Sequence, residues 1–146
     1  MRVGEVMNRR VISIEPASTL REAGRLMKEY DIGFLVVSNR GQVLGVLTDR
    51  DMVVRGLAAG AEPLTARADE AMTHGVFWCR EDDDLDEAVR AMGEKKVRRL
   101  LVLDAEDRPV GVISLGDVAA RCGAGESFCG ALAALCREVA GRRPEW

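Results

Sequence analysis

The chain repeats itself, and this repeat is the feature that most constrains its fold. At an offset of 65 positions Glu5 falls on Glu70, and after a one-residue insertion an offset of 66 carries Asp51 onto Asp117. The other matched positions of the first copy are Met7, Val11, Leu20, Glu22, Ala23, Met27, Leu35, Val37, Gly45, Val46 and Arg55. A fixed internal period indicates that one structural unit occurs more than once. The sequence therefore predicts a tandem duplication.

Each copy shows the same order of secondary-structure signals. In the first copy, Thr19 and Glu22 predict a capping box for a helix that runs to about Tyr30, and in the second Asp84 and Glu87 take these places. Two short apolar runs separated by turn residues follow each helix, which predicts a hairpin. The expected strands are residues 34–37 and 43–47 in the first copy and 97–102 and 110–113 in the second.

A second helix is expected after each hairpin. Thr48 or Asp49, and Ser114 or Asp117, supply side-chain oxygens for the free N–H groups of its first turn. One unit of about 60 residues buries too little surface to be robust alone, so the two copies should pack on each other. The predicted fold class is α+β: tandem β-α-β-β-α units packed pseudo-symmetrically, plus a short C-terminal helix.

The chain of 146 residues divides into three expected regions. Residues 1–62 hold the first unit with the N-terminal segment and linker, residues 63–122 the second unit, and residues 123–146 a tail. In the tail, Ser127 predicts the start of a helix and Gly141 its end. Its apolar stripe is Phe128, Leu132, Leu135 and Val139. We interpret this stripe as a face that packs on its own domain or on a second copy.

Composition argues against several classes of protein. The 21 Lys and Arg against 24 Asp and Glu give a net charge of −3, which disfavours a nucleic-acid partner. No apolar stretch approaches the roughly 20 residues of a membrane-spanning helix, and no secretory signal is visible, so a cytoplasmic protein without a membrane partner is expected. The single His74 and the lack of a C-x-x-C pair predict no metal site. The four cysteines, Cys79, Cys122, Cys129 and Cys136, are interpreted as structural.

One short motif occurs once in each copy, directly after the hairpin. It reads Gly-Val-Leu-Thr-Asp-Arg-Asp over residues 45–51 and Gly-Val-Ile-Ser-Leu-Gly-Asp over residues 111–117. With residues 31–33 and 97–100 at the strand entrances, it makes residues 3–121 resemble the CBS domain family, and specifically the tandem pair called a Bateman module. The resemblance implies a cleft between the two units that binds an adenosine-containing ligand such as AMP, ADP, ATP, NAD or S-adenosylmethionine.

The residue types present suit such a ligand. A carboxylate such as that of Asp117 can accept hydrogen bonds from both ribose hydroxyls, and a guanidinium such as that of Arg99 fits phosphate oxygens. By resemblance, one site uses Ser114, Asp117, Val112 and Arg99 with Ile32, Gly33 and the backbone of residues 13–15. The pseudo-symmetric site uses Thr48, Asp51 and Arg50 with Val97 and Arg98.

The sequence departs from the family pattern at three positions. Phe34 stands where the second copy has Arg99, so the second site lacks one basic phosphate partner. Phe34 and Val36, and likewise Leu101, stand where small residues or proline are frequent in the family, and we expect these larger side chains to narrow the cleft. The site with Asp117 is therefore the better candidate.

A structural interpretation competes with binding at each position. Thr48 and Ser114 also qualify as helix caps, and Asp51 and Asp117 as charges that favour the first helical turn. A solvated strand edge is the alternative for Lys95, Lys96, Arg98 and Arg99; we favour it for the two lysines and favour ligand contact for Arg99. The favoured function is a regulatory sensor that requires no cofactor, takes the adenosyl ligand as effector, and acts through a homodimer or an unknown regulated protein. The alternative is a ligand-free module for dimerisation and protein interaction. An enzyme is not expected, because the sequence offers no triad, metal cluster or catalytic carboxylate pair.

Overall fold

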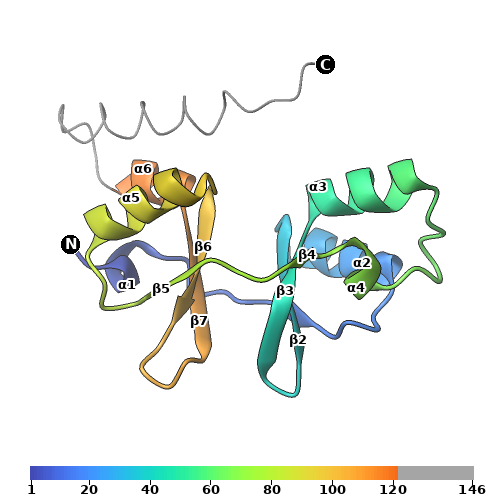
Figure 1. The fold of residues 1–146 in the computed structure, drawn as a ribbon, viewed down its shortest axis with the longest axis horizontal. Helices are drawn as coiled ribbons and strands as arrows, with labels where there is room; N and C mark the ends of the chain where they lie inside the picture. The colour runs from blue at the N-terminus through green and yellow to red at the C-terminus, as the bar shows by residue number, and fades with distance from the viewer. Residues whose placement is uncertain (122–146) are drawn as a thin grey trace. The chain divides into compact units, whose positions relative to one another are not determined.

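The computed structural model describes residues 1–121, and the predicted C-terminal helix within residues 123–146 lies outside this part. The chain forms two compact units (Figure 1). One, the first-repeat unit, is Val11–Val76. The other, the second-repeat unit, combines Met1–Arg10 with the chain from Phe77 onward. The predicted α+β class and the duplication are confirmed.

The first-repeat unit is built on one sheet, which has four strands in the order β1-β2-β3-β4 within residues 1–121. β1 (Ser13–Ile14) runs parallel to β2 (Phe34–Asn39), which forms a hairpin with β3 (Gln42–Thr48), and β4 (Thr73–His74) is antiparallel to β3. Its helices are α2 (Leu20–Tyr30), α3 (Asp49–Asp51), η1 (Met52–Gly56), η2 (Leu57–Ala59) and α4 (Ala68–Ala71).

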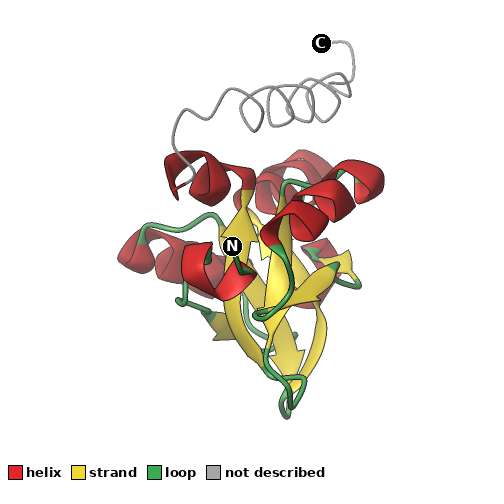
Figure 2. Ribbon diagram, turned by 90° about the vertical axis from the view of Figure 1, so that its left-hand side faces the viewer, coloured by secondary structure: helices red, strands yellow, loops and turns green. Residues whose placement is uncertain are grey.

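The second-repeat unit has the same plan. β5 (Trp78–Arg80) runs parallel to β6 (Arg99–Leu103), and β6 forms a hairpin with β7 (Pro109–Ser114). Its helices are α1 (Val3–Val6), α5 (Leu85–Lys95) and α6 (Leu115–Arg121). Asn8 makes an antiparallel bridge to Val112, in the place that β4 takes in the first-repeat unit. Figure 2 separates the helices, in red, from the strands, in yellow.

The structure differs from the expected boundaries of 1–62 and 63–122, because each repeat gives its first residues to the other unit. Val3, Val6 and Met7 are buried in the core of the second-repeat unit. Ala68, Ala71 and Met72 are buried in the core of the first-repeat unit. Burial of these apolar side chains, which the linear order of the chain does not reveal, therefore decides which segment belongs to which unit.

Several local expectations are also adjusted. The segment that joins the two repeats, residues 57–69, which we expect from Gly60 and Pro63 to be a connector, contains η2 and the start of α4. Asp84 caps α5 through the N–H of Asp86 at 2.9 Å, so no capping box forms with Glu87. β6 begins at Arg99, so Lys95 is the last residue of α5 and Lys96, with a φ of 57°, is its C-cap. These two lysines are exposed at a helix end, and no strand edge runs through them.

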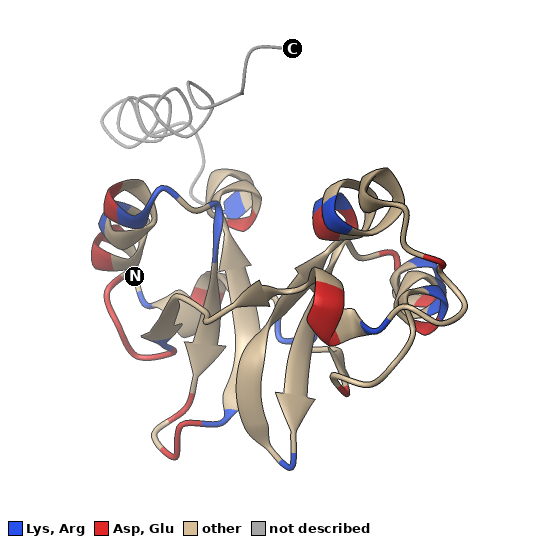
Figure 3. Cartoon of the chain, turned by 45° about the vertical axis from the view of Figure 1, so that its right-hand side comes forward, with Lys and Arg blue, Asp and Glu red and all other residues tan. Residues whose placement is uncertain are grey.

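Charged residues lie on the helices and turns, and the sheets are nearly free of them (Figure 3). The turn between β6 and β7 is held by Asp104, whose carboxylate accepts from the backbone N–H of Glu106 at 3.0 Å and from Nε of Arg108 at 2.8 Å. The hydrogen bond from the Arg108 side chain is the main reason why the pKa of Asp104 lies below its usual value. These hydrogen bonds and the ion pair hold the turn, while the side chains that pack in the core come from the strands.

The glycine that begins the repeated motif lies where the first residues of the other repeat pair with the second strand of the hairpin. Gly45 on β3 pairs with His74 of β4, and a Cβ at Gly45 would collide with the backbone oxygen of Thr73. At Gly111 a Cβ would lie 2.5 Å from Sδ of Met7 and 3.0 Å from the oxygen of Asn8. Because glycine has no Cβ, it lets the two backbones approach at these positions.

We expect Gly45→Ala to lower the free energy of unfolding by about 2 kcal/mol or more, because the new methyl group must push β4 away from β3. Gly24→Ala is the matched control, since its Cβ would meet only Cε of Met52 at an ordinary 3.5 Å, and it should stabilise α2 by about 0.5–1 kcal/mol. Urea unfolding followed by circular dichroism measures both. Equal effects of the two substitutions would contradict the close approach.

Candidate ligand-binding site

The second-repeat unit presents a carboxylate at the junction of β7 and α6. Ser114 ends the strand, and its Oγ accepts from the N–H of Asp117 at 3.1 Å. In return, Oδ2 of Asp117 accepts from the N–H of Ser114 at 2.8 Å and from its Oγ at 2.6 Å. This reciprocal pair is a capping box with Asp in the third position. Within residues 1–121, no hydrogen bond or ion pair engages Oδ1 of Asp117.

Arg99 lies directly across from this cap. It begins β6 and pairs with Ser114 in the antiparallel register, so the two side chains share one face of the sheet. Val112, two residues before Ser114, lies on the same face. Arg99 is exposed and makes no ion pair with any residue of the described part. The fold therefore brings Arg99, Val112, Ser114 and Asp117 together, and we call these four residues the Asp117 half-site.

The first-repeat unit carries the matching half-site, Phe34, Thr48 and Asp51, which we call the Asp51 half-site. Oγ1 of Thr48 accepts from the N–H of Asp51 at 3.0 Å, and Oδ2 of Asp51 accepts from the N–H of Thr48 at 3.1 Å. Phe34 pairs with Thr48 in the register, as Arg99 pairs with Ser114. The interpretation of Thr48 and Ser114 as helix caps is thus confirmed, and their contact with a ligand stays a prediction.

Two residues missing from the predicted site take part at Asp51. Oγ1 of Thr73 lies 3.3 and 3.4 Å from the two carboxylate oxygens, within hydrogen-bond distance, and Nη2 of Arg55 lies 3.8 Å from Oδ1. The Asp51 side chain is only 12% exposed as a result. The spacing of Asp51 and Arg55, four residues apart on a helical segment, is a sequence signal for this pair. Thr73 has no such signal, because it arrives through the pairing of β4 with β3.

The remaining predicted residues lie at the strand entrances. A Cβ at Gly33 would lie 2.6 Å from Oδ2 of the exposed Asp49, so a larger residue there would require the Asp49 side chain to move. Ile32 and Val97 are half-buried, and each packs on the core of its own unit. Arg98 and Arg50 are exposed. Their predicted roles toward a base or a phosphate stay predictions.

Cys79 belongs to the core and not to a reactive site. It is 6% exposed, and burial, with a smaller contribution from the Asp83 carboxylate, raises the pKa of its thiol to about 12. A thiol of this kind is inert near neutral pH, which agrees with a structural role. The other three cysteines lie outside the described residues.

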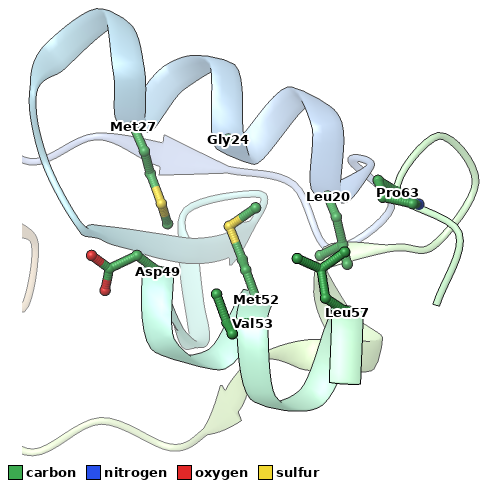
Figure 4. Close-up of a pocket in the computed structure, with 8 residues that line it drawn as sticks. All are labelled: Leu20, Gly24, Met27, Asp49, Met52, Val53, Leu57 and Pro63. Atoms are coloured by element: carbon green, nitrogen blue, oxygen red, sulfur yellow. The ribbon is translucent and has the colours of Figure 1, made fainter. Parts of the chain in front are cut away.

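The first-repeat unit also has an apolar groove of about 340 Å³, drawn in Figure 4. The groove lies between α2 and the helical segments that follow β3, and it is lined by Leu20, Gly24, Met27, Asp49, Met52, Val53, Leu57 and Pro63. Val53 and Leu57 are 54% and 61% exposed. None of the residues of either half-site lines the groove.

No described helix is long and apolar enough to span a bilayer.

Curated relatives match both repeats. Hypoxic response protein 1 of Mycobacterium tuberculosis is 36% identical over 116 residues, which are 79% of this chain and 80% of that protein. Uncharacterized protein MK0525 of Methanopyrus kandleri is 33% identical over 117 residues, which are 80% of this chain but 60% of that protein. The chain thus spans less than two thirds of MK0525.

Solved structures share the fold. The crystal structure of Hypoxic Response Protein I with two coordinated zinc ions has a TM-score of 0.72 and 34% identity, covering 83% of this chain and 98% of that one. The cytosolic domain of the Mg²⁺ channel MgtE in complex with ATP has a TM-score of 0.68 and 28% identity, covering 80% of this chain and 47% of that one. Zinc and ATP are ligands of those proteins. In residues 1–121 of this chain, no three His, Cys, Asp or Glu side chains gather as metal ligands.

A family model described as "CBS domain" matches the chain twice, at residues 3–56 and 68–123. Both matches end just beyond the capped carboxylate of their repeat. The chain belongs to the CBS domain family and carries two CBS domains in tandem.

Proposed function

We propose that this chain is a non-catalytic regulatory module that binds an adenosine-containing ligand through the Asp117 half-site. The observation that carries the proposal is the pair of groups left available there. Oδ1 of Asp117 has no partner within residues 1–121, and the exposed Arg99 lies across the hairpin beside Ser114. A carboxylate suits the ribose hydroxyls, and a guanidinium suits a phosphate.

The charge of the half-site favours one class among the adenosine ligands. Arg99, the cation of this half-site, is exposed and makes no ion pair within the described part of the chain. Its guanidinium attracts a phosphate and repels the sulfonium of S-adenosylmethionine. The proposed effectors are therefore AMP, ADP, ATP or NAD. The solved relative with ATP bound, the MgtE cytosolic domain, supports this class.

Regulation follows from binding only if the ligand distinguishes two states of the protein. A ligand shifts an equilibrium by its differential affinity for those states and by nothing more. The states proposed here are two arrangements of a homodimer or of a complex with a regulated protein. Occupancy of the Asp117 half-site would favour one of them.

We expect Asp117→Asn to weaken binding of AMP, ADP or ATP at least about 10-fold, because the amide loses the charge that strengthens the ribose contacts while its oxygen still accepts at the cap. Glu94→Gln, on an exposed position of α5, is the charge-matched control and should bind as the wild type does. Isothermal titration calorimetry measures both. No heat with AMP, ADP, ATP or NAD in the wild-type protein would sink the proposal.

Arg99→Met should weaken ATP about 10-fold and leave adenosine unchanged, since it removes a phosphate partner and no ribose partner. Arg90→Met, at an exposed position of α5, controls for the loss of one positive charge. Competition titrations of ATP and adenosine provide the comparison. An equal loss for both ligands would show that Arg99 does not contact phosphate.

The apolar groove favours a second candidate function, self-association. Exposed apolar side chains around a hollow are typical of protein interfaces, and Val54 and Leu64, at 49% and 56% exposure, extend the apolar surface in this unit. Such an interface would form between copies of the chain whether or not a nucleotide binds.

Leu57→Glu should convert a wild-type dimer into a monomer, because it places a charge in an interface that excludes water. Gln42→Glu, at an exposed position of β3, adds the same charge away from the groove and should leave the mass unchanged. Sedimentation velocity reports the mass of each. A dimer that survives Leu57→Glu would place the interface elsewhere.

A further inference from the structure

The duplicated chain contains an internal comparison, because the same capped carboxylate occurs twice with different surroundings. At Asp51 both oxygens are engaged: Oδ2 by the N–H of Thr48 at 3.1 Å, and both oxygens by Oγ1 of Thr73 at 3.3 to 3.4 Å. The guanidinium of Arg55 adds an ion pair at 3.8 Å. With 12% of its side chain exposed, Asp51 has little surface left for a ligand.

Arg55 is itself held in place. Its Nη1 donates to the backbone oxygen of Met72 at 3.0 Å and its Nη2 to Oγ1 of Thr73 at 3.3 Å. Asp51, Arg55 and Thr73 thus form a closed set of contacts that ties α3 and η1 to the start of β4. We call these three residues the Asp51 triad.

The equivalent residues of the second-repeat unit are turned to other partners. Asn8 stands at the position of Thr73, and its Oδ1 accepts from the N–H of Arg10 at 2.9 Å. Arg121 stands at the position of Arg55, and its Nη1 donates to the oxygen of Glu5 at 3.2 Å. No described residue outside the cap therefore binds the carboxylate of Asp117.

The residue that pairs with the capping residue across the hairpin also differs between the two half-sites. The residue across the hairpin from the cap is Arg99 in one half-site and Phe34 in the other. Phe34 is half-buried and offers no donor to a phosphate. The Asp51 half-site therefore lacks both an available carboxylate oxygen and an arginine at the strand position of Arg99.

We propose that the two half-sites have divided their roles, so that one adenosine phosphate binds per chain, at Asp117, while the Asp51 triad closes the other half-site and serves stability. This inference rests on the proposed function for the Asp117 half-site. A ribose at Asp51 would have to displace the contacts that the carboxylate already makes with the hydroxyl of Thr73 and the guanidinium of Arg55. Such an exchange leaves little net gain, because the contacts it replaces already satisfy the carboxylate.

Calorimetric titration of AMP into the full-length wild-type protein should give one molecule per chain. Asp117→Asn should abolish this binding or weaken it at least about 10-fold, whereas Asp51→Asn should change the affinity less than about 2-fold. Two molecules per chain, or an equal loss in both variants, would overturn the division of roles and leave nucleotide binding intact. The absence of binding by AMP, ADP, ATP and NAD alike would instead overturn the proposed function.

Thermal unfolding without ligand tests the structural role of the triad by itself. Asp51→Asn removes an ion pair with Arg55 and the charge on the acceptor of Thr73, whereas Asp117→Asn alters only a cap, so the melting temperature should fall by about 4 °C more in Asp51→Asn. Thr73→Val, which keeps the shape of the side chain, should lower it in the same direction. Equal melting temperatures for Asp51→Asn and Asp117→Asn would show that the triad has no such role.

Discussion

The exchange of the first residues between the two repeats is the constraint on which the rest of the structure depends. Met7 and Asn8 lie against β7 at Gly111, and Thr73 and His74 pair with β3 at Gly45. Thr73 and His74 form the outer strand of their sheet, and Asn8 makes a single bridge to β7. The short helix before each contact is buried in the core of the same unit. A Cβ at Gly45 or Gly111 would clash with the paired segment, which explains why the repeated motif begins with glycine.

The exchanged segments also differ at one equivalent position of the two repeats. Thr73 pairs with Val46 in the first-repeat unit, and Asn8 takes the equivalent place against Val112 in the second-repeat unit. Oγ1 of Thr73 lies within hydrogen-bond distance of the Asp51 carboxylate, whereas Oδ1 of Asn8 accepts from the N–H of Arg10 and no described hydrogen bond joins Asn8 to Asp117. Thr73 and Arg55 contact the carboxylate of Asp51, whereas Asn8 and Arg121 have other partners and leave Oδ1 of Asp117 without a described contact. In the proposed division of roles, both copies stay folded while only the Asp117 half-site binds a ligand.

The apolar groove and the Asp117 half-site point to a division between assembly and sensing. The groove is lined by methionine, leucine and valine side chains and offers few polar partners for a nucleotide. The half-site offers charged groups and little apolar surface. In the proposed function, a ligand acts on an assembly only if its affinity differs between the two arrangements of that assembly. Separate surfaces for the two tasks allow each to change without loss of the other.

Local interactions are what the sequence by itself determined. The repeat is visible by comparing the chain with itself. Contacts within a few residues form the helix from Leu20 to Tyr30, both hairpins and the caps at Thr48 and Ser114, so the spacing of residue types predicts them. Only the tertiary structure decided which unit each initial segment joins, and that Thr73, 22 residues from Asp51, binds its carboxylate. The physical reason is distance along the chain: the burial of Val3 and the approach of Thr73 arise from packing between remote segments, which no local pattern encodes.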